Sequence, residues 1–170
     1  VAQLKGLNRA FVAQGLKVMS GRRNTGLDAL MTASRLHRPP LCSDLGFALG
    51  PRINAGGRVG KSDLGVRLLT TTDPDEARRI AEELDALNQE RRAIEADVQA
   101  EADALAERQN NRAVVVVSGQ GWHPGVIGIV ASRIAETYHR PTIIIAFHDD
   151  GTGQGSGRSV EGFDLYSALA

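Results

Sequence analysis

The 170-residue sequence predicts an α/β protein in which a long helix joins a helical first segment to a strand–helix–strand unit. Apolar side chains recur at three- and four-residue spacing over residues 74–109, which is typical of one amphipathic helix. The β-branched runs at 113–117 and 142–147 predict two buried strands, and the periodicity of 126–138 predicts a helix between them. Strand, helix and strand within so few residues make a βαβ-like unit.

The first segment predicts two helices, over residues 7–20 and 25–36. A glycine at position 21 is a stop signal for the first helix, and Asn24 is a suitable cap for the second. Pro39 and Pro40 then exclude a continuing helix, because proline disfavours helical backbone in the residue before it.

Residues 45–58 are too rich in glycine for a helix and too irregular for a strand, so we expect an irregular connector there. After it, residues 62–71 predict a short helix with Ser62 as its N-cap.

The long helix has the clearest start signal, because Asp73 suits the N-cap and Pro74 the first helical position. From 74 to 109 it would extend about 54 Å at about 1.5 Å per residue. Its apolar positions are Ile80, Leu84, Leu87, Ile94, Val98, Ala102 and Leu105, with Arg91 at the one skipped position. Such a narrow stripe on so long a helix predicts a coiled-coil arm or a rigid bridge between two compact bodies, without chemistry of its own.

The last segment continues after the second strand with a turn at 149–151 and a third strand at 154–160, which we expect to pair back onto the sheet. A further helix is expected to begin near Asp164. The chain begins at Val1 without a methionine and ends a few residues into that helix, so we expect an excised fragment of a longer protein.

The formal net charge of zero is a cancellation between segments. Residues 1–72 carry eleven basic and three acidic side chains, a net charge of +8. Residues 73–112 have a net charge of −6 and residues 113–170 one of −2. Because separated charge steers a polyanion, neutrality of the total does not exclude a nucleic-acid partner.

Composition excludes several other classes. Hydrophobic residues at 42% and charged residues at 24% are typical of a soluble globular protein. The longest uncharged apolar run, residues 113–117, is too short to span a bilayer, and no signal peptide is visible. Cys42 is the single cysteine, which excludes an internal disulfide and predicts a reducing compartment.

The segment GQGWHPGVIG at 119–128 leaves a strand and enters a helix, where backbone N–H groups attract an anion. It is not a dinucleotide loop, because Pro124 stands where the third glycine should be. His123 in this segment is either a phosphate donor or acid–base group, or a turn histidine stacked beside Trp122. The four histidines show no close spacing for metal ligands.

Two further segments combine small residues with arginine. In GSGRS at 155–159, the backbone can approach a ligand closely, hydroxyls can donate, and a guanidinium can bind a phosphate; the alternative is a flexible turn. In PRINAGGR at 51–58, two arginines flank an asparagine, which predicts either an arginine-lined anion site on a tight loop or a glycine-rich connector with solvated arginines.

Three blocks in order resemble the RecJ-type exonucleases of the DHH phosphoesterase superfamily. They are LGFALGPRINAGGRVG at 45–60, GWHPGVIGIVASRI at 121–134 and DGTGQGSGRSVEGFD at 150–164. The stretch ELDALNQER at 83–91 is similar to the start of that family's connecting helix, and the resemblance runs from about Leu7 to the end.

The resemblance implies a fold and an organisation. Residues 1–72 would be the helical C-terminal part of a DHH catalytic domain, 73–112 the connecting helix, and 113–170 the N-terminal part of an α/β DHH-associated domain that binds nucleic acid. Single-stranded DNA would thread between the two domains and be cleaved from its 5′ end in DNA repair and recombination. Two divalent metals, manganese or magnesium, would activate the attacking water. No Asp-His-His occurs here, so the metal ligands are expected before Val1, and the fragment is expected to hold no catalytic residue and to be inactive alone.

The resemblance also implies site residues, each one a contact to substrate phosphate. They are Ser156, Gly157, Arg158 and Ser159 of the Gly-Ser-Gly-Arg-Ser motif, His123 of the Trp-His-Pro-Gly motif, and Arg52, Asn54 and Arg58 of the Pro-Arg-Ile-Asn-Ala block. That last block has Gly56-Gly57 before its last arginine, where the usual form has Ala-Gly.

The implied partners are single-stranded DNA, a single-strand-binding protein and a helicase in the cytoplasm, with no membrane. Two alternatives stay open. One is a DHH-family phosphodiesterase for short oligonucleotides or cyclic dinucleotides, which the absence of a Gly-Gly-Gly-His-like loop at 155–158 disfavours. The other is a non-catalytic nucleic-acid-binding protein.

Overall fold

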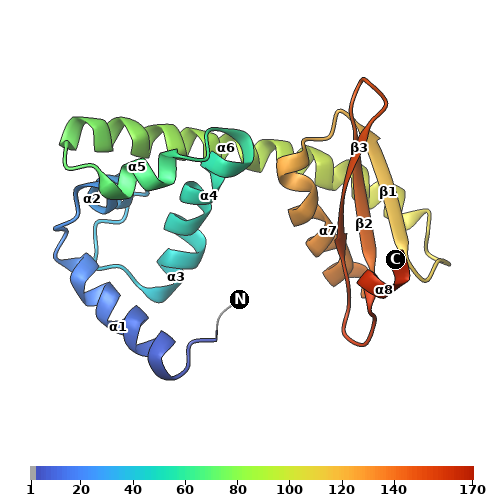
Figure 1. Ribbon diagram of the computed structural model, residues 1–170, viewed down its shortest axis with the longest axis horizontal. Helices are drawn as coiled ribbons and strands as arrows, with labels where there is room; N and C mark the ends of the chain where they lie inside the picture. The colour runs from blue at the N-terminus through green and yellow to red at the C-terminus, as the bar shows by residue number, and fades with distance from the viewer. Residues whose placement is uncertain (1–2) are drawn as a thin grey trace. The chain divides into compact units, whose positions relative to one another are not determined.

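The computed structural model describes residues 3–170 and divides the chain into two compact units (Figure 1). Unit 1 extends to Glu90 and unit 2 begins at Arg91, so the division falls inside the long helix α6 (Pro74–Glu107). Within residues 3–170 the chain is 61% helical and has one three-stranded sheet, which confirms the α/β prediction.

Every regular element of unit 1 within residues 3–90 is a helix. Its elements are α1 (Gly6–Ser20), α2 (Thr25–Ala33), α3 (Cys42–Asp44), a π-helical turn η1 (Leu45–Leu49), α4 (Gly50–Val59), α5 (Leu64–Thr70) and the first part of α6. The first two predicted helices are confirmed. The second ends three residues early, since Arg35 adopts a left-handed conformation with φ +58°.

The expectation of an irregular connector at 45–58 is wrong, because η1 and α4 make this segment helical. The Gly50 N–H donates to the Leu45 carbonyl and closes a wide turn just before Pro51, whose nitrogen has no proton to donate. A Cβ on Gly50 would lie 2.6 Å from that carbonyl oxygen, so glycine is needed there. Gly56 then lets α4 approach α6, and such packing outweighs the low helix propensity of glycine.

The core of unit 1 lies between α2, α5 and α6, and its fully buried members include Leu30, Leu68 and Leu84. Gly26 of α2 faces α5 so closely that a Cβ would lie 1.7 Å from the Leu68 carbonyl oxygen. The N-cap of α5 is Asp63 rather than the expected Ser62.

Helix α6 begins at the predicted Pro74, where the Asp73 carboxylate accepts the N–H of Asp75 at 2.9 Å, and it ends two residues before the predicted 109. Its apolar stripe contributes to two cores. Residues such as Ile80 and Leu84 belong to the core of unit 1, and residues such as Val98 and Ala102 to that of unit 2.

Unit 2 contains the rest of α6 and a sheet of strand order β1-β2-β3. Its elements are β1 (Val115–Gln120), α7 (Pro124–Tyr138), β2 (Thr142–Phe147), β3 (Gly153–Arg158) and α8 (Leu165–Leu169). Strands β1 and β2 are parallel, and β3 is antiparallel to β2 with Ile144 opposite Ser156. The predicted βαβ-like unit and the third strand that pairs back are thus confirmed, with the first strand at 115–120 rather than 113–117 and the third at 153–158 rather than 154–160.

Helix α7 lies against β2 and β3 (Figure 1). Val126, Val130 and Ile134 face the core together with Val115 and Ile144 of the sheet. This packing sets one side of α7 against β3, which carries the GSGR sequence. No helix within residues 3–170 has the length and apolar character that a membrane span requires.

Candidate phosphate-binding site

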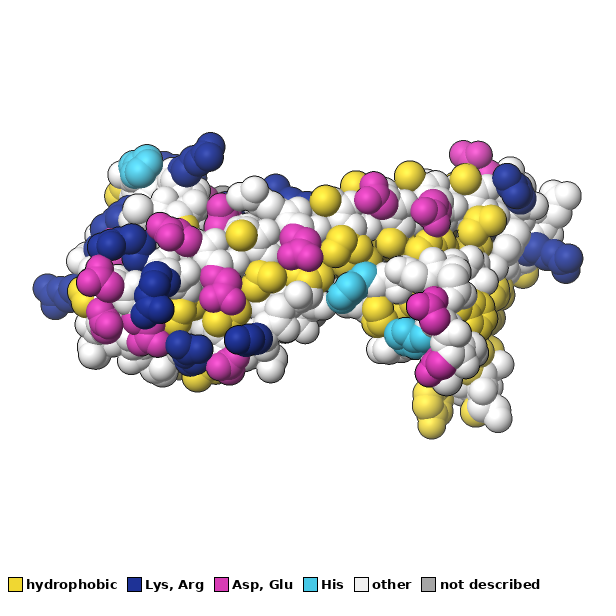
Figure 2. All heavy atoms as spheres, turned by 90° about the horizontal axis from the view of Figure 1, so that it is seen from above, with side chains coloured by type: hydrophobic (Ala, Val, Ile, Leu, Met, Phe, Trp, Pro, Cys, Tyr) yellow, Lys and Arg dark blue, Asp and Glu magenta, His cyan; other side chains and the backbone are white. Residues whose placement is uncertain are grey.

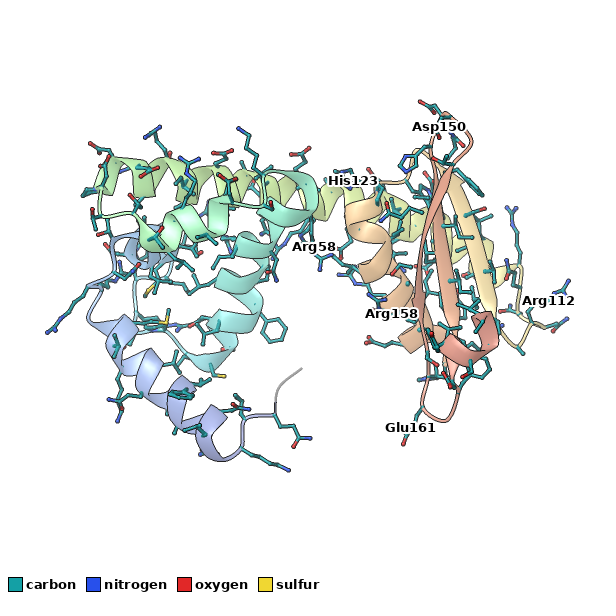
Figure 3. All side chains as sticks on the ribbon, in the orientation of Figure 1. Arg58, Arg112, His123, Asp150, Arg158 and Glu161 are labelled. Carbon is teal, nitrogen blue, oxygen red and sulfur yellow. The ribbon has the colours of Figure 1, made fainter. Side chains whose placement is uncertain are left out.

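Arg158, the last residue of β3, is held by three hydrogen bonds on the side of the strand that faces α7 (Figure 3). Its Nε donates to Ser132 Oγ of α7 at 2.9 Å. Its Nη1 donates to Ser156 Oγ at 3.1 Å and to the Gly157 carbonyl at 2.7 Å. The antiparallel strand thus brings Ser156, Gly157 and Arg158 together with a serine from another element. The segment is a strand rather than the flexible turn that was the alternative.

Beside Arg158 is a hollow of about 310 Å³. The residues in its lining that carry polar or charged side chains are Ser132, Glu136, His139, Arg158, Ser159 and Glu161. Ser159 donates its hydroxyl proton to the carbonyl groups of Val160 and Phe163, in the turn that follows β3. In this arrangement the Ser159 hydroxyl orders the turn, and Arg158 supplies the permanent positive charge in the lining of the hollow.

His123 is the N-cap of α7, and its Nδ1 accepts the N–H of Gly125 at 3.0 Å. In the neutral ring this leaves Nε2 to carry the proton and to act as a donor. Between His123 and Ser132 the helix rises by about 13 Å, so His123 lies well away from the Arg158 hydrogen bonds. The structure places His123 at an anion-attracting helix end, outside the lining of the hollow.

Trp122 is 5% exposed, and its Nε1 donates to the Glu101 carboxylate at 2.8 Å. Its indole lies against Gly119, where a Cβ would be 2.1 Å from the nearest ring atom. This residue therefore anchors the loop to α6, and it is not available to stack on a base.

The three candidate residues of unit 1 lie on α4, not on a loop. Arg52 is largely committed to the fold, because its Nε donates to Asp85 of α6 at 2.7 Å and its Nη1 to the Ala48 carbonyl at 2.8 Å. Asn54 and Arg58 are exposed and four residues apart, so they share one face of the helix. The structure therefore separates Arg52 from the other two.

Charge is more evenly mixed in space than along the chain. The acidic first part of α6 belongs to unit 1, whose thirteen basic and ten acidic side chains give a net charge of +3. Unit 2 has a net charge of −3. Figure 2 shows acidic and basic side chains intermixed over unit 1, and Arg67 pairs with Glu76 at 2.9 Å. Anion binding by unit 2 must thus depend on local groups such as Arg158.

Comparison with known proteins gives a consistent result. Residues 109–170 match the DHHA1 domain family. Relatives named single-stranded-DNA-specific exonuclease RecJ are 45% identical in Dickeya dadantii and 44% identical in Escherichia coli, each over 99% of this chain. Over nearly its whole length this chain is similar to RecJ proteins. It spans about 30% of the length of those two RecJ relatives.

Solved RecJ structures share the fold. The crystal structure of RecJ from Thermus thermophilus in complex with Mn²⁺ matches 99% of this chain with a TM-score of 0.84 and 35% identity. A Mg²⁺ complex of the same protein matches equally well. This chain covers 25% and 26% of those two RecJ chains, respectively.

Two carboxylates of unit 2, neither of them in the lining of the hollow, accept hydrogen bonds in turns or at a helix start. Hydrogen bonds from Thr152 lower the pKa of Asp150 in the turn before β3, and hydrogen bonds from Ser167 lower the pKa of Asp164 at the start of α8. Across residues 3–170, no three His, Cys, Asp or Glu side chains are grouped so as to hold a metal ion.

Two residues at the site were missed by sequence reasoning, Gly128 and Ser132 of α7. A Cβ on Gly128 would lie 3.0 Å from Arg158 Nη2 and 3.1 Å from Ser156 Oγ. The signal that could have found them is a pair of small residues four apart on the amphipathic helix, inside a block that already resembled the RecJ family.

Proposed function

We propose that this chain contributes DNA-backbone contacts to a metal-dependent, single-stranded-DNA-specific exonuclease that releases nucleotides from the 5′ end. The relatives that carry this name are 36 to 45% identical over nearly the whole chain. The observation that carries the proposal is the guanidinium of Arg158, held at the end of β3 between two serine hydroxyls. A fixed cation among small residues suits a phosphodiester and does not select a base.

Each part of the chain has a place in this proposal. Residues 1–72 correspond to the C-terminal part of the catalytic domain, 73–112 to the connecting helix, and 113–170 to the start of the DHH-associated domain. Asn54 and Arg58 contribute a second phosphate contact from the exposed face of α4. His123 contributes a third through Nε2, while Arg52 holds α4 against α6. Ser156 and Gly157 support Arg158, and Ser159 shapes the turn behind it.

The divalent metal, manganese or magnesium, is proposed to bind outside residues 3–170, since those residues offer no ligand group of the required kind. When bound it supplies an activated water for attack on phosphorus. The chain alone is accordingly expected not to cleave DNA. Its proposed setting is cytoplasmic DNA repair and recombination, with a single-strand-binding protein and a helicase as further partners.

The test is binding of labelled single-stranded oligonucleotides by this chain at several salt concentrations. Arg158→Ala should weaken binding of all sequences alike and lower the slope of log affinity against log salt by about one counterion. Arg112→Ala is the matched control, because Arg112 is an exposed arginine of the same unit away from β3 (Figure 3).

Equal affinity and salt slope for Arg158→Ala and the unaltered chain would overturn the assignment of Arg158. A separate incubation with labelled single strand and Mn²⁺ tests the metal proposal. Release of nucleotides by the purified chain would show that the catalytic centre has been misplaced.

A further inference from the structure

Ser132 of α7 makes two hydrogen bonds that fix the direction of its hydroxyl. The Oγ donates to the Gly128 carbonyl, one turn earlier, at 3.1 Å. Its lone pairs are then left to accept from outside the helix, and Arg158 Nε donates to the same oxygen at 2.9 Å. Because the proton is committed to the helix backbone, this hydroxyl is an acceptor for the guanidinium rather than a competing donor.

Gly128 is the second residue of α7 that lies against the Arg158 guanidinium. A side chain there would press on both Arg158 Nη2 and Ser156 Oγ, at 3.0 and 3.1 Å from its Cβ. The guanidinium therefore lies over a helix surface without side-chain bulk at Gly128 and with an acceptor at Ser132. Gly128 has no side chain, and the Ser132 hydroxyl is engaged by the Gly128 carbonyl and by Arg158, so we expect any effect of these residues on phosphate binding to pass through Arg158.

The hydrogen bonds of Arg158 within the protein determine which of its N–H groups can still donate to a ligand. A guanidinium has five N–H groups. In Arg158, Nε donates to the Ser132 hydroxyl, and Nη1 donates to the Ser156 hydroxyl and the Gly157 carbonyl. Nη2 lies beside Gly128, and none of these three hydrogen bonds uses its two N–H groups. Because Ser132 occupies Nε, we expect a phosphate to bind through Nη2.

We propose that Ser132 is a positioning residue that, together with Gly128, orders Arg158 before DNA binds and directs its Nη2 end to the phosphate. This inference rests on the proposed function of Arg158. A long arginine side chain loses rotamer freedom when it binds, and ordering it in advance removes that cost from the binding step. Ser132 thus raises affinity for a phosphodiester without touching it.

The experiment compares four variants of the chain by anisotropy of a short, 3′-labelled oligothymidylate. They are Ser132→Ala, Ser132→Thr, Arg158→Ala and Ser118→Ala. Ser132→Ala should weaken binding about fivefold, the usual effect of losing one hydrogen bond of about 1 kcal/mol. Its salt slope should stay unchanged, because the charge of Arg158 remains. Ser132→Thr keeps the acceptor and should restore binding, and Ser118→Ala controls for loss of an exposed serine on β1.

A second readout separates positioning from a general effect on folding. In ¹⁵N-arginine spectra, the Nε–H of Arg158 should exchange slowly with water in the unaltered chain and in Ser132→Thr, and quickly in Ser132→Ala. Unchanged Trp122 emission in all variants would show that unit 2 is intact. If Ser132→Ala alone lost the native Trp122 emission, the serine would have a role in folding, and the proposal would be overturned.

The outcomes distinguish this inference from the proposed function. If Arg158→Ala weakens binding while Ser132→Ala does not, the positioning role is wrong and the phosphate role of Arg158 survives. If neither variant changes binding, or the unaltered chain does not bind, both proposals fail.

Discussion

Glu95 on α6 is a buried acid between two arginines of unit 2. It is 3% exposed, and it accepts from Arg91, one turn earlier on α6, and from Arg133 of α7. Arg91 is 9% exposed, whereas the Arg133 side chain is 54% exposed. The perturbation we consider is Glu95→Gln, which keeps the shape of the side chain and removes its charge.

The structure allows the magnitude to be worked out. Breaking a buried ion pair by removing one partner costs about 3–5 kcal/mol, because the remaining charge stays buried without compensation. That cost applies to the Arg91 pair. The half-exposed Arg133 pair adds about 0–1 kcal/mol. Glutamine retains one oxygen as an acceptor, so we expect a loss of about 2–4 kcal/mol in the free energy of unfolding of unit 2.

The assay is urea unfolding followed by tryptophan emission. Trp122 is the only tryptophan and lies buried in unit 2, so its signal reports this unit. With a denaturant slope of about 1 kcal/mol per molar urea, the midpoint should fall by about 2–4 M. Glu90→Gln is the matched control, as Glu90 is an exposed glutamate on the same helix, and its midpoint should move little.

A midpoint for Glu95→Gln equal to that of Glu90→Gln would refute the reasoning. It would mean that Arg91 gains as much from solvent or from other partners in the variant as it gains from Glu95. The charge network would then be neutral for stability, as replaced buried ion pairs sometimes are.

Two further predictions follow from close contacts. Gly119→Ala places a Cβ 2.1–2.5 Å from three atoms of the Trp122 indole. The variant should therefore destabilise unit 2 by about 1–3 kcal/mol and shift the tryptophan emission. Unchanged emission and an unchanged unfolding midpoint would contradict the packing described. Hydrogen bonds from Arg38 and from the Leu41 N–H hold the pKa of Asp44 below its ordinary value of about 3.9. The stabilisation is therefore present at neutral pH and is lost as the pH falls through the lowered pKa. The stability difference between the unaltered chain and Asp44→Asn, followed by circular dichroism of unit 1, should shrink from pH 7 toward pH 3, and a constant difference would contradict it.

Local signals predicted much of the fold correctly. Asp73 and Pro74 marked the start of α6, because capping and proline geometry depend on neighbouring residues only. The β-branched run at 142–147 gave the bounds of β2, since a strand buried in a sheet needs such residues. Local signals failed at 45–58, where glycine content opposed a helix that packing against α6 stabilises.

At the candidate site, too, some features were predicted from local sequence and others depend on packing. From the sequence alone we predicted the candidate phosphate contacts: Arg158 with its small neighbours, His123 before a helix, and the arginines of the 51–58 segment. The hydrogen bonds that Arg52 and Arg158 make became visible in the folded chain alone. The Arg52–Asp85 and Arg158–Ser132 hydrogen bonds join residues 33 and 26 positions apart, and no local pattern encodes such pairs. The physical reason is that the hydrogen-bonding capacity of a guanidinium is fixed by its chemistry, whereas the acceptors that use it are brought together by packing of the backbone.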